Sequence, residues 1–105
     1  MNNKTYNGWT NYETWNVALW MDNDSSEYWN ERAEEVYKES EKDKTFSKEE
    51  RAVLDLSEII KDEHEENTPT VTGVYADLLN AALSEVNWYE IAQHLIEAIK
   101  AEAVS

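Results

Sequence analysis

The chain contains no cysteine and only two glycines among its 105 residues. Without cysteine, disulfides, thiolate metal sites and cysteine nucleophiles are excluded. The two glycines lie far apart, at Gly8 and Gly73, so no glycine-rich loop is present to cradle a phosphate. The absence of cysteine also fits a reducing compartment, and we expect a cytoplasmic protein.

Long apolar runs and basic residues are scarce as well. No stretch approaches the about 20 apolar residues needed to cross a bilayer, and the first residues lack the features of a signal peptide. Nine Lys and Arg residues against 23 Asp and Glu residues leave a formal net charge of −14. Because nucleic acids and anionic membranes are bound through basic side chains, we expect neither as a direct ligand. A field of this sign attracts a basic partner instead.

Aromatic residues are plentiful and gather near the N-terminus. Residues 6–20 hold three of the five tryptophans and two of the six tyrosines. Each large ring can bury about 150–250 Å² of surface. Residues 1–105 can therefore form one stable acidic domain, although a chain of this length has only a modest core.

The centre of this domain is predicted to be a tryptophan-rich helix over residues 11–22. Tyr12, Trp15 and Leu19 share one stripe of it, whereas Trp20 falls on another side. A helix that is apolar nearly all round needs partners nearly all round. The tryptophans that we expect in the core are Trp15, Trp20 and Trp29.

Hydrophobic periodicity predicts an all-α bundle of about five helices, and no segment shows the alternation of a strand. The predicted helices cover residues 11–22, 25–42, 48–66, 74–84 and 88–101. Four capping boxes predict helix starts: Thr10 with Glu13, Asp24 with Glu27, Ser47 with Glu50, and Asn87 with Glu90. Residues 1–9 form a polar leader that turns at Asn7-Gly8, and 67–73 form the longest loop. The buried face of the fourth helix is predicted to carry Tyr75, Leu78, Leu79 and Ala82.

Carboxylates recur along the third predicted helix at i, i+3, i+7 and i+10. At 1.5 Å per residue, such a row spans roughly 15 Å, with neighbouring carboxylates about 5–6 Å apart. The second helix adds further acids, and together the rows could imitate a short length of nucleic acid. The predicted partner-binding residues are Glu31, Glu34, Glu35, Asp55, Glu58, Asp62, Glu65 and Glu66. Two alternatives to mimicry stay open: a charged face that serves solubility alone, and halophilic adaptation.

A second candidate surface is the aromatic edge that precedes and begins the first helix. Tyr6, Trp9 and Tyr12 lie there, and tyrosine and tryptophan are frequent at interface hot spots. Stacking on nucleic-acid bases is not favoured, because it normally accompanies a cationic groove. We expect these three residues to make secondary contacts to a protein partner.

Metal and catalytic patterns find no support in the sequence. Asp22, Asp24 and Ser26 imitate the start of a calcium loop, but Glu27 and Ala33 stand where that loop needs glycine and glutamate. The two histidines, His64 and His94, lie in no zinc motif and are predicted to be surface residues. No serine lies in a nucleophile elbow. We therefore expect no metal, no cofactor and no enzymatic activity.

Two stretches resemble a family of small proteins from bacteria, plasmids and phages. Trp9–Trp20 (WTNYETWNVALW) resembles the N-terminal signature of that family, and Tyr75–Trp88 (YADLLNAALSEVNW) resembles its second block. The family has no assigned activity, so the resemblance implies no catalytic residues. It implies an accessory gene of mobile elements, a gene pool whose small acidic products often resemble antirestriction or anti-CRISPR proteins.

The leading hypothesis is therefore a non-enzymatic inhibitor whose acidic helices occupy the nucleic-acid-binding groove of a basic host protein. The alternative is a structural or regulatory module that binds its partner through the aromatic edge. The identity of the partner, formation of a homodimer and ordering of the 67–73 loop on binding stay open.

Overall fold

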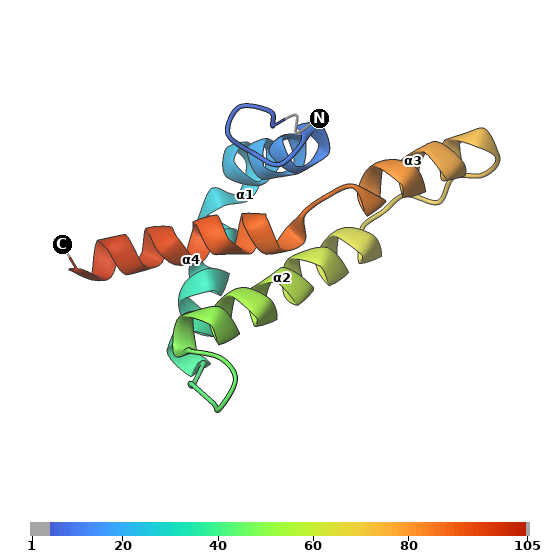
Figure 1. The fold of residues 1–105 in the computed structure, drawn as a ribbon. Helices are drawn as coiled ribbons and strands as arrows, with labels where there is room; N and C mark the ends of the chain where they lie inside the picture. The colour runs from blue at the N-terminus through green and yellow to red at the C-terminus, as the bar shows by residue number, and fades with distance from the viewer. Residues whose placement is uncertain (1–4, 105) are drawn as a thin grey trace.

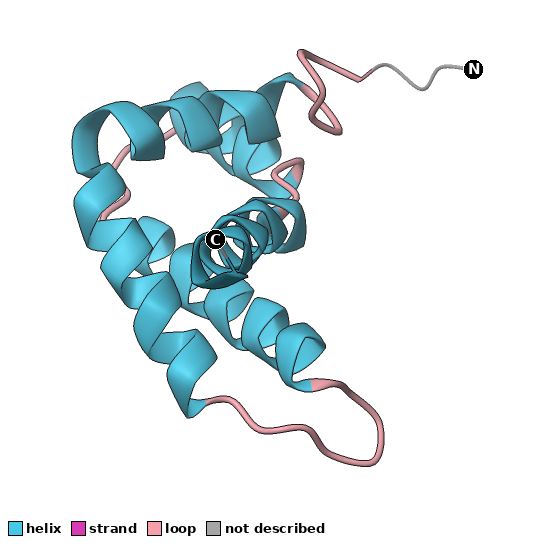
Figure 2. Ribbon diagram, turned by 90° about the vertical axis from the view of Figure 1, so that its left-hand side faces the viewer, coloured by secondary structure: helices cyan, strands magenta, loops and turns pink. Residues whose placement is uncertain are grey.

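The computed structural model describes residues 5–104, which form four helices and no strand (Figure 1). The helices are α1 (Tyr12–Glu39), α2 (Lys48–Glu66), α3 (Val74–Ser84) and α4 (Trp88–Val104). Loops alone connect them (Figure 2). The prediction of an all-α protein is confirmed, and the predicted bounds of 48–66 and 74–84 match α2 and α3. Within the described part of the chain, none of these helices is both long and apolar enough to span a membrane.

The two helices predicted over 11–22 and 25–42 are one helix, so the expected number of about five is corrected to four. The predicted break is a kink at Ser25, whose φ of −150° and ψ of 33° are not helical. The Ser25 hydroxyl donates to Met21 O at 3.3 Å. The helix continues because Met21 and Trp29, on either side of the kink, are buried in the same hydrophobic cluster. The polar Asp, Asn and Ser residues thus still bend the chain at Ser25, while the burial of Met21 and Trp29 keeps helix on both sides of the kink.

Helix starts follow side-chain capping, although not always by the predicted residue. Ser47 and Glu50 form the predicted capping box at the start of α2, with hydrogen bonds of 3.1 and 2.9 Å. At α1 the cap is Asn11, whose Oδ1 accepts a hydrogen bond from Thr14 N at 2.9 Å. Two predicted boxes are therefore wrong: Thr10 with Glu13, and Asp24 with Glu27.

The start of α4 is tied to the beginning of the chain. Asn87 Oδ1 accepts from Glu90 N at 3.0 Å, as the predicted box requires. The Glu90 carboxylate does not return to Asn87 but accepts from Thr10 N at 3.0 Å. The free Asn87 N–H donates instead to the hydroxyl of Thr14, a side chain with 0% exposure. The half of the capping box that would join Glu90 to Asn87 N is thus replaced by two long-range hydrogen bonds, which tie the start of α4 to Thr10 and Thr14.

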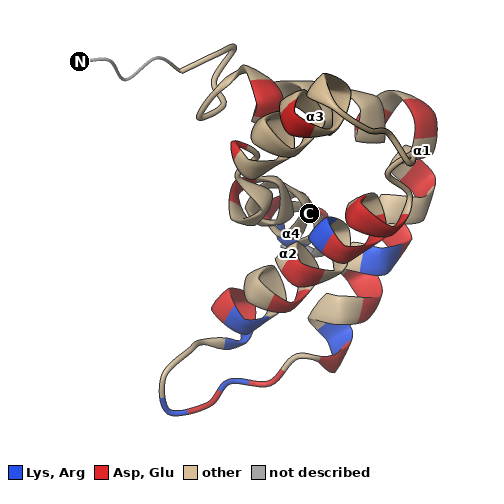
Figure 3. Cartoon of the chain, turned by 90° about the vertical axis from the view of Figure 1, so that its right-hand side faces the viewer, with Lys and Arg blue, Asp and Glu red and all other residues tan. Residues whose placement is uncertain are grey.

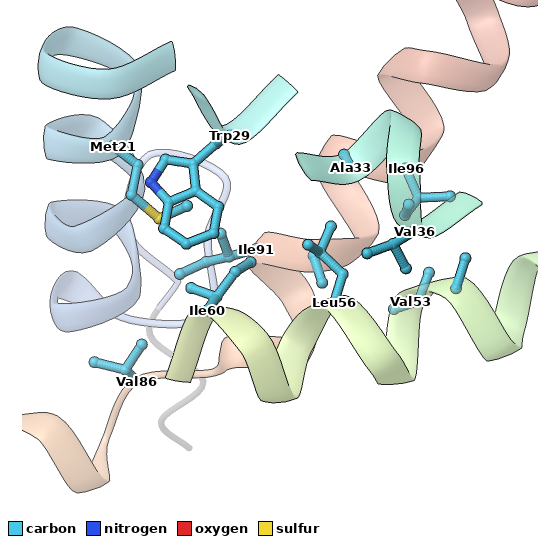
Figure 4. Close-up of a cluster of buried hydrophobic side chains, with 12 residues drawn as sticks. Met21, Trp29, Ala33, Val36, Val53, Leu56, Ile60, Val86, Ile91 and Ile96 are labelled. Atoms are coloured by element: carbon cyan, nitrogen blue, oxygen red, sulfur yellow. The ribbon is translucent and has the colours of Figure 1, made fainter. Parts of the chain in front are cut away.

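Helices α1, α2 and α4 share one hydrophobic core (Figure 4). Leu56 and Ile60 from α2 and Ile96 from α4 are fully buried, and Ala33 of α1 packs with them. The period of about 3.6 residues that places these side chains on one face of each helix is the pattern visible in the sequence. The remaining buried members are Met21, Trp29, Val36, Ala52, Val53, Val86, Ile91 and Ala92.

Several large side chains predicted to be buried are exposed. Trp29 is in the core, as predicted, but Trp20 is 59% exposed. On α3, Tyr75 and Leu78 are 70% and 63% exposed, so the predicted buried face of that helix is wrong at both positions. Periodicity finds an apolar stripe but does not say whether another element covers it. For α1 near Trp20 and for this face of α3, none of the described residues does.

Helix α3 extends to the end of the molecule opposite the C-terminal end of α4 (Figure 1). None of its side chains is buried. The radius of gyration is 15.0 Å, compared with about 13 Å for a typical 100-residue domain. The excess is consistent with an α3 that projects from the three-helix core.

Candidate interaction surface

The row of acids on α2 faces solvent. Asp55, Glu58, Asp62, Glu65 and Glu66, here called the α2 row, lie on the side of the helix away from Ala52, Val53, Leu56 and Ile60 in the core. Glu58, Asp62, Glu65 and Glu66 are exposed, and none of the four makes an ion pair within residues 5–104. The burial of one face of α2 therefore fixes the outward direction of the other.

Basic side chains neutralise only part of the acidic surface. Asp55 Oδ1 lies 3.4 Å from Arg51 Nη2, one turn earlier on the same helix. Glu49 Oε1 accepts from Lys100 Nζ at 2.6 Å, and this hydrogen bond raises the pKa of the Lys100 ammonium. Since these pairs are exposed to solvent, each contributes little to stability. Most of the acidic charge is not balanced by these pairs.

The predicted acids of α1 do not all lie beside the α2 row. Glu35 Oε1 is 3.3 Å from Arg32 Nη1, and Arg32 Nη2 is 3.7 Å from Glu63 Oε2 on α2. Glu34 instead lines a groove with Ile99 of α4. Glu31 is exposed. Of the three predicted acids on α1, Glu35 thus lies beside Arg32 and Glu34 beside α4, whereas the five residues of the α2 row share a single direction.

Acidic positions, with a few basic ones among them, run along α1 and α2, whereas α3 is almost free of charge (Figure 3). The basic residue inside the α2 row is Lys61, which is exposed beside Glu65 at the end of α2 that precedes the 67–73 loop. The charged surface is therefore a property of the α1–α2 side of the molecule.

A polar contact between α1 and α2 was not expected from the sequence. The Tyr28 hydroxyl donates to the Glu63 carboxylate and lies 2.8 Å from both of its oxygens. This hydrogen bond raises the pKa of Tyr28, because ionising the phenol would place two negative charges together. Arg32 approaches the same carboxylate. The contact spans 35 residues of sequence, so no local pattern marks it.

The aromatic edge is built by a tight turn at Asn7-Gly8. Asn7 and Gly8 have φ values of 49° and 89°, the left-handed backbone that Asn-Gly favours in two-residue turns. Tyr6 and Trp9 exchange two backbone hydrogen bonds of 2.8 Å across the turn. The turn points Tyr6 at Tyr12, with ring centroids 5.1 Å apart in a T-shaped arrangement. Residues 6–9 of the predicted polar leader are thus structured.

Tyr6, Tyr12 and Trp15 form a cluster of three rings. The Tyr6 and Tyr12 rings lie 4.9 and 5.5 Å from Trp15, and the two tyrosines are 40% and 49% exposed. This exposure leaves ring surface for a partner. The sequence pointed to Tyr6 and Tyr12 but did not show that Trp15 joins them.

Trp9 lies against α4 and closes a small cleft. Its ring stacks on His94 with centroids 4.1 Å apart. Together with Met21, Trp29 and Ile91 the two rings line a mainly apolar cavity of about 150 Å³. The second histidine, His64, lies between Trp29 and Trp88 at 6.0 and 5.3 Å. Both histidines therefore pack against tryptophan, which their polar sequence neighbours did not indicate.

Across the described residues, no group of three or more His, Asp or Glu side chains is arranged to hold an ion. The groups whose pKa departs from its ordinary value lie in surface contacts. The pKa is raised for Tyr28 beside Glu63, for Arg32 beside Glu35 and for Lys100 beside Glu49. The pKa of Asp43 is lowered by hydrogen bonds from the N–H groups of Phe46 and Thr45. These groups do not converge on the cleft beneath Trp9.

The two stretches that carry the family resemblance contact one another. Asn11 Nδ2 donates to Glu85 O at 2.7 Å, and Asn87 N donates to Thr14 Oγ1 at 2.8 Å. These contacts join the first stretch to the end of the second across more than 70 residues of sequence. The pattern therefore contains residues that hold the fold together.

Comparison with known proteins gives one result. No curated protein matches the chain, and no solved structure matches it. A family model does, over residues 2–104, and its description is a family of unknown function, DUF7249. Because the match covers nearly the whole sequence, the chain belongs to this family of unknown function.

Proposed function

We propose that the chain is a non-enzymatic interaction protein whose α2 row occupies a basic, nucleic-acid-binding groove on another protein. The observation that carries this proposal is the single outward direction of Glu58, Asp62, Glu65 and Glu66, none of which forms an ion pair with a described basic residue. A formal charge of −14 would also speed the encounter with a basic partner.

The charge density of the α2 row resembles that of a nucleic-acid strand. Five carboxylates between Asp55 and Glu66 give about one charge per 3–4 Å, at a rise of 1.5 Å per residue. One strand of duplex DNA carries one phosphate per about 3.4 Å of axis. Because α2 is fixed by its buried face, the carboxylates need little ordering on binding, which favours affinity.

We further propose that the partner is a host defence protein, such as a nuclease or restriction factor. This proposal rests on the resemblance of Trp9–Trp20 and Tyr75–Trp88 to proteins of phages and plasmids, together with the acidic surface. Antirestriction or anti-CRISPR inhibition is the corresponding biological role, and the compartment would be the cytoplasm.

The test neutralises the α2 row. The variant Glu58→Gln/Asp62→Asn/Glu65→Gln/Glu66→Gln removes four charges, and Asp24→Asn/Glu27→Gln/Glu41→Gln/Glu97→Gln is a control with the same change in net charge. Immobilised wild-type protein and both variants are used to capture nucleic-acid-binding proteins from a host lysate. Each captured protein is then tested for displacement of a DNA duplex by the three forms, with folding checked by circular dichroism.

The wild type and the control should displace the duplex, whereas the α2-row variant should lose the effect. Displacement should also weaken steeply between 0.05 and 0.5 M NaCl, because added salt screens exposed charges. Equal displacement by all three forms would contradict a role for the α2 row. The absence of any displaced duplex would contradict nucleic-acid mimicry.

A second candidate function is favoured by the exposed rings of Tyr6 and Tyr12. In this alternative the partner binds the aromatic edge, and the acids serve solubility alone. Tyr12→Ala should then abolish capture of the partner, and salt should barely change it. The α2-row variant would bind as the wild type does, so the same lysate experiment separates the two functions.

A further inference from the structure

Helix α3 carries an apolar stripe that faces solvent. Val74, Tyr75 and Leu78 are 61%, 70% and 63% exposed, and Val71 in the preceding loop is 38% exposed. Ala81 is exposed and Ala82 half-buried on the same side. Within α3, positions 74, 75, 78, 81 and 82 follow the spacing of a helix face that packs against another helix, and Val71 precedes them in the loop.

The stripe lies in a part of this highly charged chain that carries little charge. Asp77 is the one charged residue between positions 67 and 84, whereas 30% of the whole sequence is charged. Figure 3 shows the contrast with α1 and α2. Two copies of the molecule, each with a net charge of −14, repel one another at most orientations. Contact through α3 brings few of these charges together, because Asp77 is the one charged residue of that helix.

We propose that this stripe binds a second copy of the chain, with the two α3 helices antiparallel about a two-fold axis near Leu78. In that arrangement Leu78 faces its own counterpart. Val74 then faces Ala82, and Tyr75 faces Ala81, so on both sides of the Leu78 pair a large side chain meets a small one. A closed two-fold contact requires a surface that complements itself in this way.

The stability of the proposed dimer depends on the surface area that the stripe can bury. With about 150–250 Å² for a tyrosine, the exposed side chains of Val71, Val74, Tyr75 and Leu78 remove roughly 400 Å² per protomer. Stable interfaces bury about 800 Å² per partner, whereas transient ones bury less. The dimer is therefore reversible and depends on concentration. Because salt screens the repulsion between the two acidic bodies, dimerisation strengthens with salt.

Sedimentation equilibrium of the full chain from 10 to 500 μM tests the proposal at 0.05 and 0.5 M NaCl. A dimer should form at the upper concentrations, and more of it at high salt. Leu78→Glu, which places two carboxylates at the axis, should reduce association at least tenfold. The matched control Asn80→Glu, on the other side of α3, should leave association within about twofold. Circular dichroism checks that both variants fold.

Two further measurements test the antiparallel geometry. An equimolar mixture of Leu78→Glu and Leu78→Lys should restore a dimer that neither variant forms alone. Since the chain has no cysteine, Leu78→Cys should cross-link to itself under mild oxidation. Val74→Cys should not, because antiparallel pairing separates the two copies of position 74 by about 12 Å.

A monomer at 500 μM in both salts would overturn the proposal, as would a dimer that survives Leu78→Glu or cross-links through Val74→Cys. This outcome is independent of the proposed function. Dimerisation through α3 strengthens with salt and does not need the α2 row, whereas binding by the α2 row weakens with salt and does not need α3.

Discussion

At the scale of single residues, the buried hydroxyl of Thr14 makes two hydrogen bonds that few other side chains could make. It donates to Asn11 Oδ1 at 2.6 Å and accepts from Asn87 N at 2.8 Å. Thr14→Val keeps the shape and removes both contacts, leaving the Asn87 N–H without its partner. The expected cost is about 1–3 kcal/mol of unfolding free energy, measured by urea denaturation.

The control for this measurement is Thr45→Val, because Thr45 is exposed and surface substitutions usually change stability by less than about 0.5 kcal/mol. If Thr14→Val and Thr45→Val gave equal unfolding midpoints, the tether between the start of α1 and the start of α4 would carry no stability.

Tyr28 provides a prediction about alkaline pH. Its folded-state pKa is raised above the ordinary value of 10.0 by the hydrogen bond to Glu63. A group with a raised pKa contributes stability fully below its unfolded pKa and loses the contribution as pH rises through the folded pKa. Tyr28→Phe should therefore lower the urea midpoint at pH 8 and make little difference well above the folded pKa.

The matched control is Tyr89→Phe, since Tyr89 is 41% exposed and has no hydrogen bond to another described side chain. Tyr89→Phe removes a hydroxyl without such a partner, so it should change the urea midpoint less than Tyr28→Phe does at pH 8, and both variants are measured from pH 8 to pH 12. A difference between Tyr28→Phe and wild type that stayed constant over this range would argue against the Glu63 contact in solution.

At the scale of helices, two tryptophans of α1 provide a matched pair. Trp29 is 5% exposed within the shared core, whereas Trp20 is 59% exposed. Trp29→Ala should cost about 3–5 kcal/mol, the range for buried aromatic residues. Trp20→Ala should cost less than about 1 kcal/mol. Thermal unfolding followed by far-UV circular dichroism measures both, and similar losses would mean that Trp20 is covered in solution.

Helix boundaries were predictable where the signals are local. The Ser47–Glu50 box and the Pro69 and Gly73 breaks set the bounds of α2 and the start of α3, and the structure agrees. The continuation of α1 through Ser25 was not predictable, because it depends on Met21 and Trp29 meeting residues of α2 and α4. Exposure of Tyr75 has the same origin: periodicity identifies a face, and only the tertiary fold decides what covers it.

The candidate surface was predictable to a similar degree. The outward direction of the α2 row follows from the buried positions on the same helix, which the sequence reveals. The neighbours of the α1 acids depend on how α1 is rotated between α2 and α4, so the sequence did not show that Glu35 lies beside Arg32 and Glu34 beside Ile99. The Tyr28–Glu63 contact and the Trp9–His94 stack join distant residues and had no local signal.

At the scale of the whole molecule, the net charge of −14 has two opposite effects. Repulsion between like charges lowers the stability of the fold, whereas the same charges favour the binding of a basic partner. Within the α2 row, acids at i, i+3 and i+4 repel by about 0.2–0.5 kcal/mol per pair at low salt. Four such pairs occur: Asp55 with Glu58, Glu58 with Asp62, and Asp62 with both Glu65 and Glu66. The folded protein therefore tolerates electrostatic repulsion on its surface, although the packing of its core does not require these acids.

Glu58→Gln/Asp62→Asn/Glu65→Gln/Glu66→Gln should consequently stabilise the protein by about 1 kcal/mol in 0.01 M NaCl, with a smaller gain in 1 M NaCl, where the Debye length falls to about 3 Å. Urea denaturation of wild type and variant at the two salt concentrations measures the difference. A surface kept for binding should show this gain in stability together with the loss of DNA displacement, since functional sites often lower stability. If the variant were less stable than the wild type at low salt, the α2 row would be part of what holds the fold together, and its acids would serve the structure of the protein and not the binding of a partner.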